Sequence, residues 1–132
     1  MKYEELTSKI IGTCIKVHSA LGPGLLESVY EEAICYEFDK SNIKYKRQLG
    51  IPVFYDGVKL DIGFRADIVV EDKVIVELKS VEAIAPLHPK IVLTYMRLSQ
   101  IQVGLLINFN VDLLKNGITR LIDDKVFSPL TP

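Results

Sequence analysis

The length and composition of the chain suit one globular domain spanning residues 1–132, because 48% of the 132 residues are hydrophobic and 25% are charged. The formal net charge of -1 argues against a strongly basic surface that would coat nucleic acid non-specifically. No apolar run reaches the roughly 18 residues of a membrane-spanning helix, and the N-terminal sequence lacks a signal-peptide pattern, so we expect a soluble protein without a membrane partner. Cys14 and Cys35 lie among apolar residues, which favours reduced, buried thiols and a cytoplasmic location.

Two helices are predicted at the start of the chain. Apolar residues recur at every third or fourth position over residues 3–21, which is typical of an amphipathic helix, and Gly22-Pro23-Gly24 ends it. A second apolar stripe predicts a helix that opens at Pro23 and Gly24 and ends near residue 41.

The middle of the chain is predicted to be β-structure. Residues 45–55 are typical of a strand, and Asp56-Gly57 is a hairpin-turn signal that leads into residues 58–61. Further on, two β-prone runs at residues 65–70 and 74–79 flank the polar residues Glu71-Asp72-Lys73, which predicts a second hairpin.

The last third of the chain returns to a helix followed by strands. Residues 86–98 have helical spacing, and residues 103–107 form a continuous apolar run typical of a buried strand. Asn116-Gly117 predicts a turn into a last strand at residues 118–122, and residues 128–132 are interpreted as a frayed tail. Helices that precede, interrupt and cover five or six strands predict an α/β or α+β fold with a mixed sheet.

The second hairpin places two acidic side chains opposite each other. If residues 71–73 form its loop, Asp67 pairs with Glu77, and Lys79 lies on the same side as Glu77. The other predicted pairs are Val70 with Val74, Val69 with Ile75, Ile68 with Val76, Ala66 with Leu78, and Arg65 with Lys79. One face of the hairpin is then expected to be wholly apolar, whereas a two-residue loop would place Asp67 among apolar side chains.

The facing carboxylates need a partner that offsets their repulsion, which amounts to roughly 0.2–1 kcal/mol for an exposed pair. One alternative is a structural cluster in which Lys79 and Arg65 neutralise the two acids. The other is a divalent cation held between the carboxylates, as Mg²⁺ is bound by a few protein oxygens together with water and substrate phosphate. The residues of the hairpin leave both alternatives open.

Other polar and aromatic residues have simpler interpretations. Tyr30 and Tyr95 occupy apolar helix positions and are interpreted as core residues with bonded hydroxyl groups, not as catalytic residues. The basic residues Lys44, Lys46 and Arg47 fit either phosphate contacts or an ordinary solvated strand face.

Asp67 followed by Glu77-Leu78-Lys79 resembles the metal-binding motif of the PD-(D/E)XK nuclease-like superfamily. Gly24, Glu27 and Tyr30 also match the signature of the GxxExxY protein family within that superfamily. The order of the later motifs matches as well: Phe64-Arg65-Ala66-Asp67, Glu77-Leu78-Lys79, Tyr95-Met96-Arg97-Leu98 and residues 103–109. The resemblance covers nearly the whole chain.

The resemblance implies a restriction-endonuclease-like fold, a mixed sheet flanked by helices, with a Mg²⁺ or Mn²⁺ site. Asp67 and Glu77 would be metal ligands, with the Leu78 carbonyl as a third. Lys79 would orient the attacking water and stabilise charge on the phosphate, and Glu27 would face the same site as a second or water-mediated ligand. In related sequences a glutamine usually stands where this chain has Ile91, and that difference puts full activity in question.

We therefore hypothesise a metal-dependent nuclease that hydrolyses DNA phosphodiester bonds. The first alternative is a catalytically inactive module that binds nucleic acid or protein and retains the nuclease fold. A further alternative is an assembly subunit that acts through an apolar surface patch, and a homo-oligomer is compatible with any of these.

Overall fold

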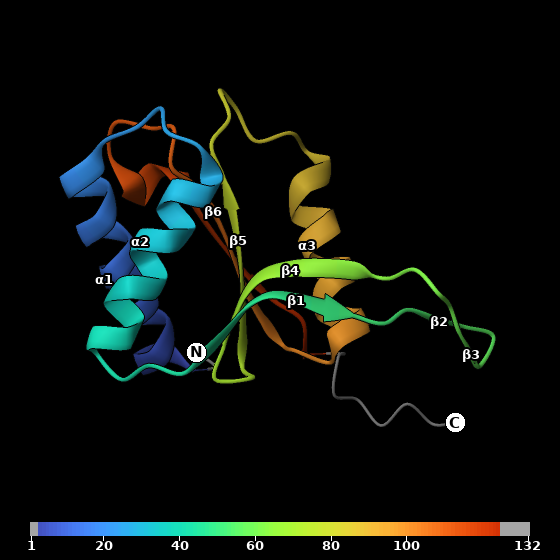
Figure 1. Ribbon diagram of the computed structural model, residues 1–132. Coiled ribbons are helices and arrows are strands. Elements are labelled where there is room, and N and C mark those ends of the chain that lie inside the picture. The colour runs from blue at the N-terminus through green and yellow to red at the C-terminus, as the bar shows by residue number, and fades with distance from the viewer. Residues whose placement is uncertain (1–2, 125–132) are drawn as a thin grey trace.

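Helices cover both faces of a five-stranded sheet in the computed structural model, which describes residues 3–124 (Figure 1). Helices α1 (Glu4–Leu21) and α2 (Glu27–Lys40) pack on one face, and α3 (Leu87–Ser99) packs on the other. Within residues 3–124 no helix is both long and apolar enough to cross a membrane.

The sheet is mixed, with the strand order β1-β4-β5-β6-β7. These strands are β1 (Tyr45–Ile51), β4 (Phe64–Val70), β5 (Val74–Lys79), β6 (Val103–Asn108) and β7 (Ile118–Ile122). Only β5 and β6 run parallel, and α3 is the crossover that a parallel connection requires. The expected mixed sheet flanked by helices is therefore confirmed.

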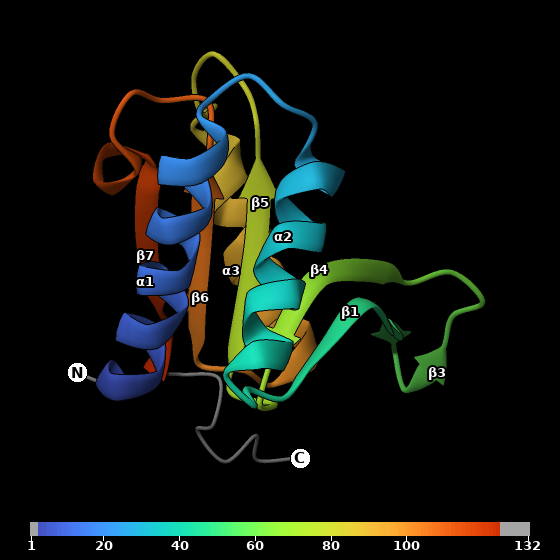
Figure 2. The same cartoon turned by 60° about the vertical axis from the view of Figure 1, so that its left-hand side comes forward.

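Two short strands form a separate hairpin outside the main sheet. Strands β2 (Phe54–Tyr55) and β3 (Val58–Lys59) pair around the predicted Asp56-Gly57 turn, and the hairpin projects from the body of the molecule (Figure 2). We call residues 52–63 the arm. The expected strand over residues 45–55 is wrong as one element, because Pro52 has no N–H group to continue a ladder and divides it into β1 and β2.

The remaining elements lie close to their predicted positions. Helix α2 starts at Glu27 and not at Pro23, because Gly24 adopts a left-handed backbone conformation with φ 94°. The expected turn at Asn116-Gly117 is part of a short 3-10 helix, η1 (Leu114–Gly117), which leads directly into β7. The predicted tail at residues 128–132 lies outside the described residues.

Each face of the sheet has its own core. The side chains of β5 and β6 alternate between a cluster under α1 and α2 and a second cluster under α3. Helix α3 approaches β6 closely because Gly104 has no side chain, and a Cβ atom there would lie 2.7 Å from Met96 Sδ. The expectation of a single apolar face is thus incomplete, since Val69 and Ile75 on the opposite face are also buried.

The hairpin of β4 and β5 has the predicted three-residue loop but separates earlier than expected. The pairs Val70–Val74, Val69–Ile75 and Ile68–Val76 are confirmed. Beyond them β4 turns away from β5 together with β1 and passes toward α3 (Figure 1), so the Asp67–Glu77, Ala66–Leu78 and Arg65–Lys79 pairs do not form as ladder pairs. We call this separation, between Asp67 on β4 and Glu77–Leu78 on β5, the fork.

Packing explains the fork. Ile68 belongs to the core under α1 and α2, whereas Ala66, two residues earlier on the same strand, belongs to the core under α3. The β1–β4 ribbon must therefore rotate between these residues in order to bury both. On β1 the rotation coincides with Gln48, which has φ 47°. Gln48 stands opposite Asp67, but the two residues do not pair in the β1–β4 ladder.

Candidate metal centre

Asp67 and Glu77 lie side by side at the fork and replace the main-chain ladder there. The Asp67 N–H donates to Glu77 Oε1 at 3.1 Å, and the Leu78 N–H donates to Asp67 Oδ2 at 2.9 Å. Each carboxylate thus accepts a hydrogen bond from the backbone of the opposite strand. These bonds hold the two groups, the acid pair, in fixed orientations.

Burial and mutual repulsion make the ionised acid pair unfavourable. Glu77 is only 7% exposed, and Asp67 is half-buried beside it. Burial, and then the negative charge of Asp67, raise the pKa of Glu77 to about 8, although the positive charge of Lys79 acts in the opposite direction. The ionised form of Glu77 is therefore disfavoured in the folded protein.

The Leu78 carbonyl is directed to the same fork. In an extended strand the N–H and C=O groups of one residue point toward the same edge. Since the Leu78 N–H donates to Asp67, the Leu78 carbonyl also faces the edge from which β4 has departed. The next carbonyl, of Lys79, faces the other edge and accepts from the Phe109 N–H at 2.8 Å.

The cations do not neutralise the acid pair by direct contact. Lys79 is half-buried and follows Glu77 by two residues, which places both side chains on the same face of β5. Arg65 instead donates from Nη1 to the Gln48 carbonyl at 3.3 Å. Across residues 3–124, no ion pair within 4.0 Å joins either acid to Lys79 or Arg65, so the alternative of a neutralised structural cluster does not form.

The donor set fits a small, hard divalent cation. Two carboxylates and one main-chain carbonyl supply the oxygen ligands that Mg²⁺ prefers, and a bound ion would relieve the repulsion within the acid pair. These residues are the ones through which the sequence resembles the PD-(D/E)XK motif. Residues 4–121 match the family model of the PD-(D/E)XK nuclease superfamily. The chain belongs to this superfamily.

Membership of the PD-(D/E)XK superfamily confirms the predicted family at that level and supports nuclease-type chemistry. Nucleases of this superfamily generally use divalent metal ions. No curated protein and no solved structure gives a significant match to the chain. The narrower assignment to the GxxExxY family stays a prediction.

Glu27 lies at the same end of the sheet as the last residues of β5, but it does not gather with the acid pair into one group. It is the first residue of α2 and is exposed, and the start of α2 lies near the end of β5 (Figures 1 and 2). Ser80 strengthens this arrangement, because its Oγ donates to the Leu25 carbonyl at 2.7 Å. Among residues 3–124, however, no three acidic, histidine or cysteine side chains gather as a metal-binding group. Any contact of Glu27 with a bound ion would therefore be indirect.

Gln48 and Glu31 belong to the site, although no motif indicated either residue. Gln48 Nε2 donates to Glu31 Oε1 at 2.7 Å and is 3.4 Å from Asp67 Oδ1. Glu31 is only 6% exposed, and the guanidinium group of Arg47 donates to its Oε2 at 2.9 and 3.1 Å. This network joins α2 to the fork. Arg47 is therefore paired with an acid, although it remains exposed on the strand face.

Helix α3 presents Tyr95 near the acid pair. The Tyr95 ring stacks on Phe64, with ring centroids 4.1 Å apart. Burial, and then the negative charges of Glu77 and Asp67, raise the pKa of Tyr95. The Tyr95 hydroxyl group is therefore close enough to the acid pair to interact with it electrostatically. Ile91 is half-buried one helical turn earlier.

Tyr30, in contrast, is a core residue as expected. It is fully buried, its ring stacks on Phe109, and its hydroxyl donates to the Gly22 carbonyl at 2.6 Å. The same hydroxyl accepts from the Leu25 N–H at 3.1 Å. Tyr30 therefore holds the loop that precedes Glu27 and has no place in the fork.

Proposed function

We propose that the protein is a Mg²⁺- or Mn²⁺-dependent nuclease that hydrolyses phosphodiester bonds in DNA. The observation that best supports this proposal is the acid pair at the fork, in which Glu77 is buried and has a raised pKa. Within residues 3–124, no cationic side chain forms an ion pair with either acid. Such an acid pair destabilises the fold, so stability does not explain its presence. Carboxyl groups with perturbed pKa values are typical of functional sites.

Each residue of the fork has a role in this proposal. Asp67, Glu77 and the Leu78 carbonyl would hold the ion, and Glu27 would contact it through water. A bound divalent ion lowers the pKa of water and stabilises the negative charge that develops on the phosphate. Lys79 has three donors and no acceptor, so it would orient the attacking water or bind a phosphate oxygen but would not ligate the metal.

The hydrogen bonds of Asp67 support a preorganised site. Its Oδ2 accepts from the Leu78 N–H, and its Oδ1 faces the Gln48 amide. Because the carboxylate is already oriented, little reorganisation would accompany ion binding.

Ile91 favours one second candidate function, a module that binds nucleic acid or protein without cleavage. Ile91 lies one helical turn before Tyr95, and an isoleucine cannot donate or accept the hydrogen bond that a glutamine at this position would supply. In this case the fold and part of the metal site would persist while the chemistry is lost.

The location and assembly of the protein are also part of the proposal. Cys14 and Cys35 are free and buried, and burial raises their pKa values to about 12 and about 11. Unpaired, unreactive thiols fit a reducing cytoplasm. A homo-oligomer is compatible with the several exposed apolar side chains of the arm.

The test is a cleavage assay with Mn²⁺ on a panel of single-stranded, duplex and branched DNA. Lys79→Met retains most of the apolar stem but removes the charge, so metal binding should persist while cleavage falls by roughly two orders of magnitude or more. Lys115→Met is the matched control, because Lys115 is exposed on η1 and should leave cleavage unchanged.

One other result would count against the nuclease, and another would count only against the role of Lys79. If neither the wild type nor Lys79→Met cleaves any substrate, while Lys79→Met only weakens DNA binding, the protein is a binding module. If the wild type cleaves and Lys79→Met cleaves equally well, the role assigned to Lys79 is wrong.

A further inference from the structure

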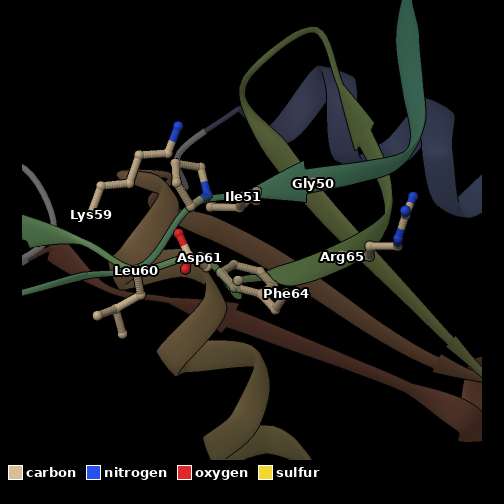
Figure 3. A pocket seen from close by; sticks show the side chains of 9 residues that line it. Gly50, Ile51, Lys59, Leu60, Asp61, Phe64 and Arg65 are labelled. Atoms are coloured by element: carbon tan, nitrogen blue, oxygen red, sulfur yellow. The ribbon is translucent and has the colours of Figure 1, made fainter.

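A cavity lies where the arm meets the ends of β1 and β4 (Figure 3). Its volume is about 590 Å³, which is within the range of small-ligand sites. Figure 3 shows Lys59 and Arg65 toward its two ends, with Asp61 and Phe64 between them. None of these residues belongs to the acid pair.

The cavity combines an aromatic ring, two cations and one carboxylate. Lys59 is exposed and, within residues 3–124, has no ion pair at 4.0 Å or less. Arg65 is also exposed and retains donors beyond its one bond to the Gln48 carbonyl. The cations suit phosphate groups, the ring of Phe64 suits a planar base, and Asp61 can accept from a base amino group.

A stacked aromatic pair connects the cavity to the fork. Phe64 lines the cavity and stacks on Tyr95, whose pKa responds to Glu77 and Asp67. Phe64 and Asp67 are three residues apart on β4, a separation of about 10 Å along an extended strand. A strand of nucleic acid at the fork would therefore pass directly to the cavity.

The base of the arm is held in a fixed position. Gly63 packs against the Ile51 carbonyl so closely that a Cβ atom at position 63 would collide with it. Beyond this contact the arm exposes large side chains, with Phe54 59% and Tyr55 73% exposed. These aromatic side chains offer further surfaces on which bases could stack.

We propose that this cavity binds one unpaired nucleotide next to the scissile phosphate, so that the preferred substrate contains a single-stranded segment. The inference rests on the proposed nuclease function and specifies its substrate. In a duplex both faces of each base are covered by neighbouring bases, so an aromatic platform can contact only an unpaired base. A second copy of this chain is less suitable, since an apolar contact would bury Lys59, Asp61 and Arg65 without partners.

The experiment measures binding without divalent metal, so that its result does not depend on cleavage. Fluorescence anisotropy in EDTA compares a labelled single strand of about 12 nucleotides with the blunt duplex formed by annealing the same strand to its complement. We expect tighter binding of the single strand. Lys59→Gln should weaken it roughly threefold to tenfold and reduce the salt slope by about 0.7, the value for one phosphate contact on a single strand.

Two further variants distinguish the loss of contacts in the cavity from a general loss of positive charge and from a folding defect. Lys115→Gln removes an equal charge far from the cavity and should retain wild-type affinity and salt slope. Phe64→Leu should weaken single-strand binding by about fivefold or more through lost stacking, with circular dichroism to verify its fold. The same sequence as RNA should show the same loss in Lys59→Gln if the sugar is not part of the recognition.

Some outcomes would overturn the cavity proposal without affecting the nuclease. These are equal affinity for duplex and single strand, or equal effects of Lys59→Gln and Lys115→Gln, in a protein that cleaves DNA. A dimer that dissociates in Tyr55→Ser while oligonucleotide affinity is unchanged would assign the arm to a second copy. Conversely, single-strand binding that depends on Lys59 in a protein without cleavage would support the cavity and reject the nuclease.

Discussion

Glu77 shows how one residue can oppose the stability of the fold that contains it. Its carboxyl group is almost completely buried and faces Asp67, and the backbone N–H of Asp67 is its only hydrogen-bond donor within residues 3–124. Because the protonated form is favoured in the folded state, the unfolded state binds fewer protons than the folded state between the two pKa values. The sign of the pH dependence follows from this difference.

We predict that metal-free protein loses stability as the pH rises from about 4.5 to about 8, the window between the ordinary and the raised pKa of Glu77. The contribution of Glu77 to the free energy of unfolding is fully present below its ordinary pKa and is lost above its raised pKa. Its size is on the order of a few kcal/mol. Urea unfolding in EDTA across this range measures it.

Glu77→Gln should flatten this pH dependence, because glutamine does not titrate. Glu71→Gln, in the exposed loop of the same hairpin, is the matched control and should retain it. A pH dependence that is identical in wild type and Glu77→Gln would show that another group is responsible.

At the scale of elements, the fork depends on a local rotation of the β1–β4 ribbon. Gln48 is a non-glycine residue in a left-handed conformation within β1, and its side chain connects Glu31 on α2 to Asp67 on β4. The backbone conformation and the side chain of Gln48 thus make separate contributions to the fork. The left-handed conformation is unfavourable for residues with a Cβ atom, while the amide orients Asp67.

Two substitutions at Gln48 separate these contributions. Gln48→Ala and Gln48→Gly both remove the amide, so both should weaken Mn²⁺ binding to a similar extent in a calorimetric titration. Only glycine adopts φ 47° without strain, so Gln48→Gly should be more stable than Gln48→Ala by about 1 kcal/mol. Equal stability of the two variants would contradict backbone strain at this residue.

At the scale of the whole molecule, the acid pair lies where three parts of the fold meet. Strand β5 is buried within the sheet, the β1–β4 ribbon departs toward α3, and α2 approaches through the Glu31–Gln48 contact. An ion bound by Asp67 and Glu77 would join β4 to β5 at the point where their ladder ends. Such an ion binds the folded state only.

Divalent metal should therefore raise the unfolding temperature. At a free Mn²⁺ concentration 100 times the dissociation constant, mass action stabilises the protein by about 2.7 kcal/mol. Thermal unfolding followed by circular dichroism, with and without millimolar Mn²⁺, measures the shift. Glu77→Ala should abolish it and Glu71→Ala should not. A wild type without any shift would exclude a metal site at the fork.

Local patterns in the sequence were sufficient to predict much of the fold and the centre of the site. The β-prone runs and the polar loop at residues 71–73 predicted the register of β4 and β5, because alternation and loop length together determine which residues face each other. Helical spacing predicted α1 and α3 to within about one residue, and the motif order predicted the superfamily. The proximity of Asp67 and Glu77 follows from the same register.

Only the tertiary structure decided how the hairpin ends and what surrounds the acid pair. The fork arises because Ala66 packs under α3, which follows the hairpin in the chain, while Ile68 packs under α1 and α2, which precede β1. The contacts of Gln48 with Glu31 and of Tyr95 with Phe64 likewise join residues far apart in the chain. Sequence periodicity specifies which face of an element is apolar but not which distant element covers that face, and that choice is made by the packing of the whole domain.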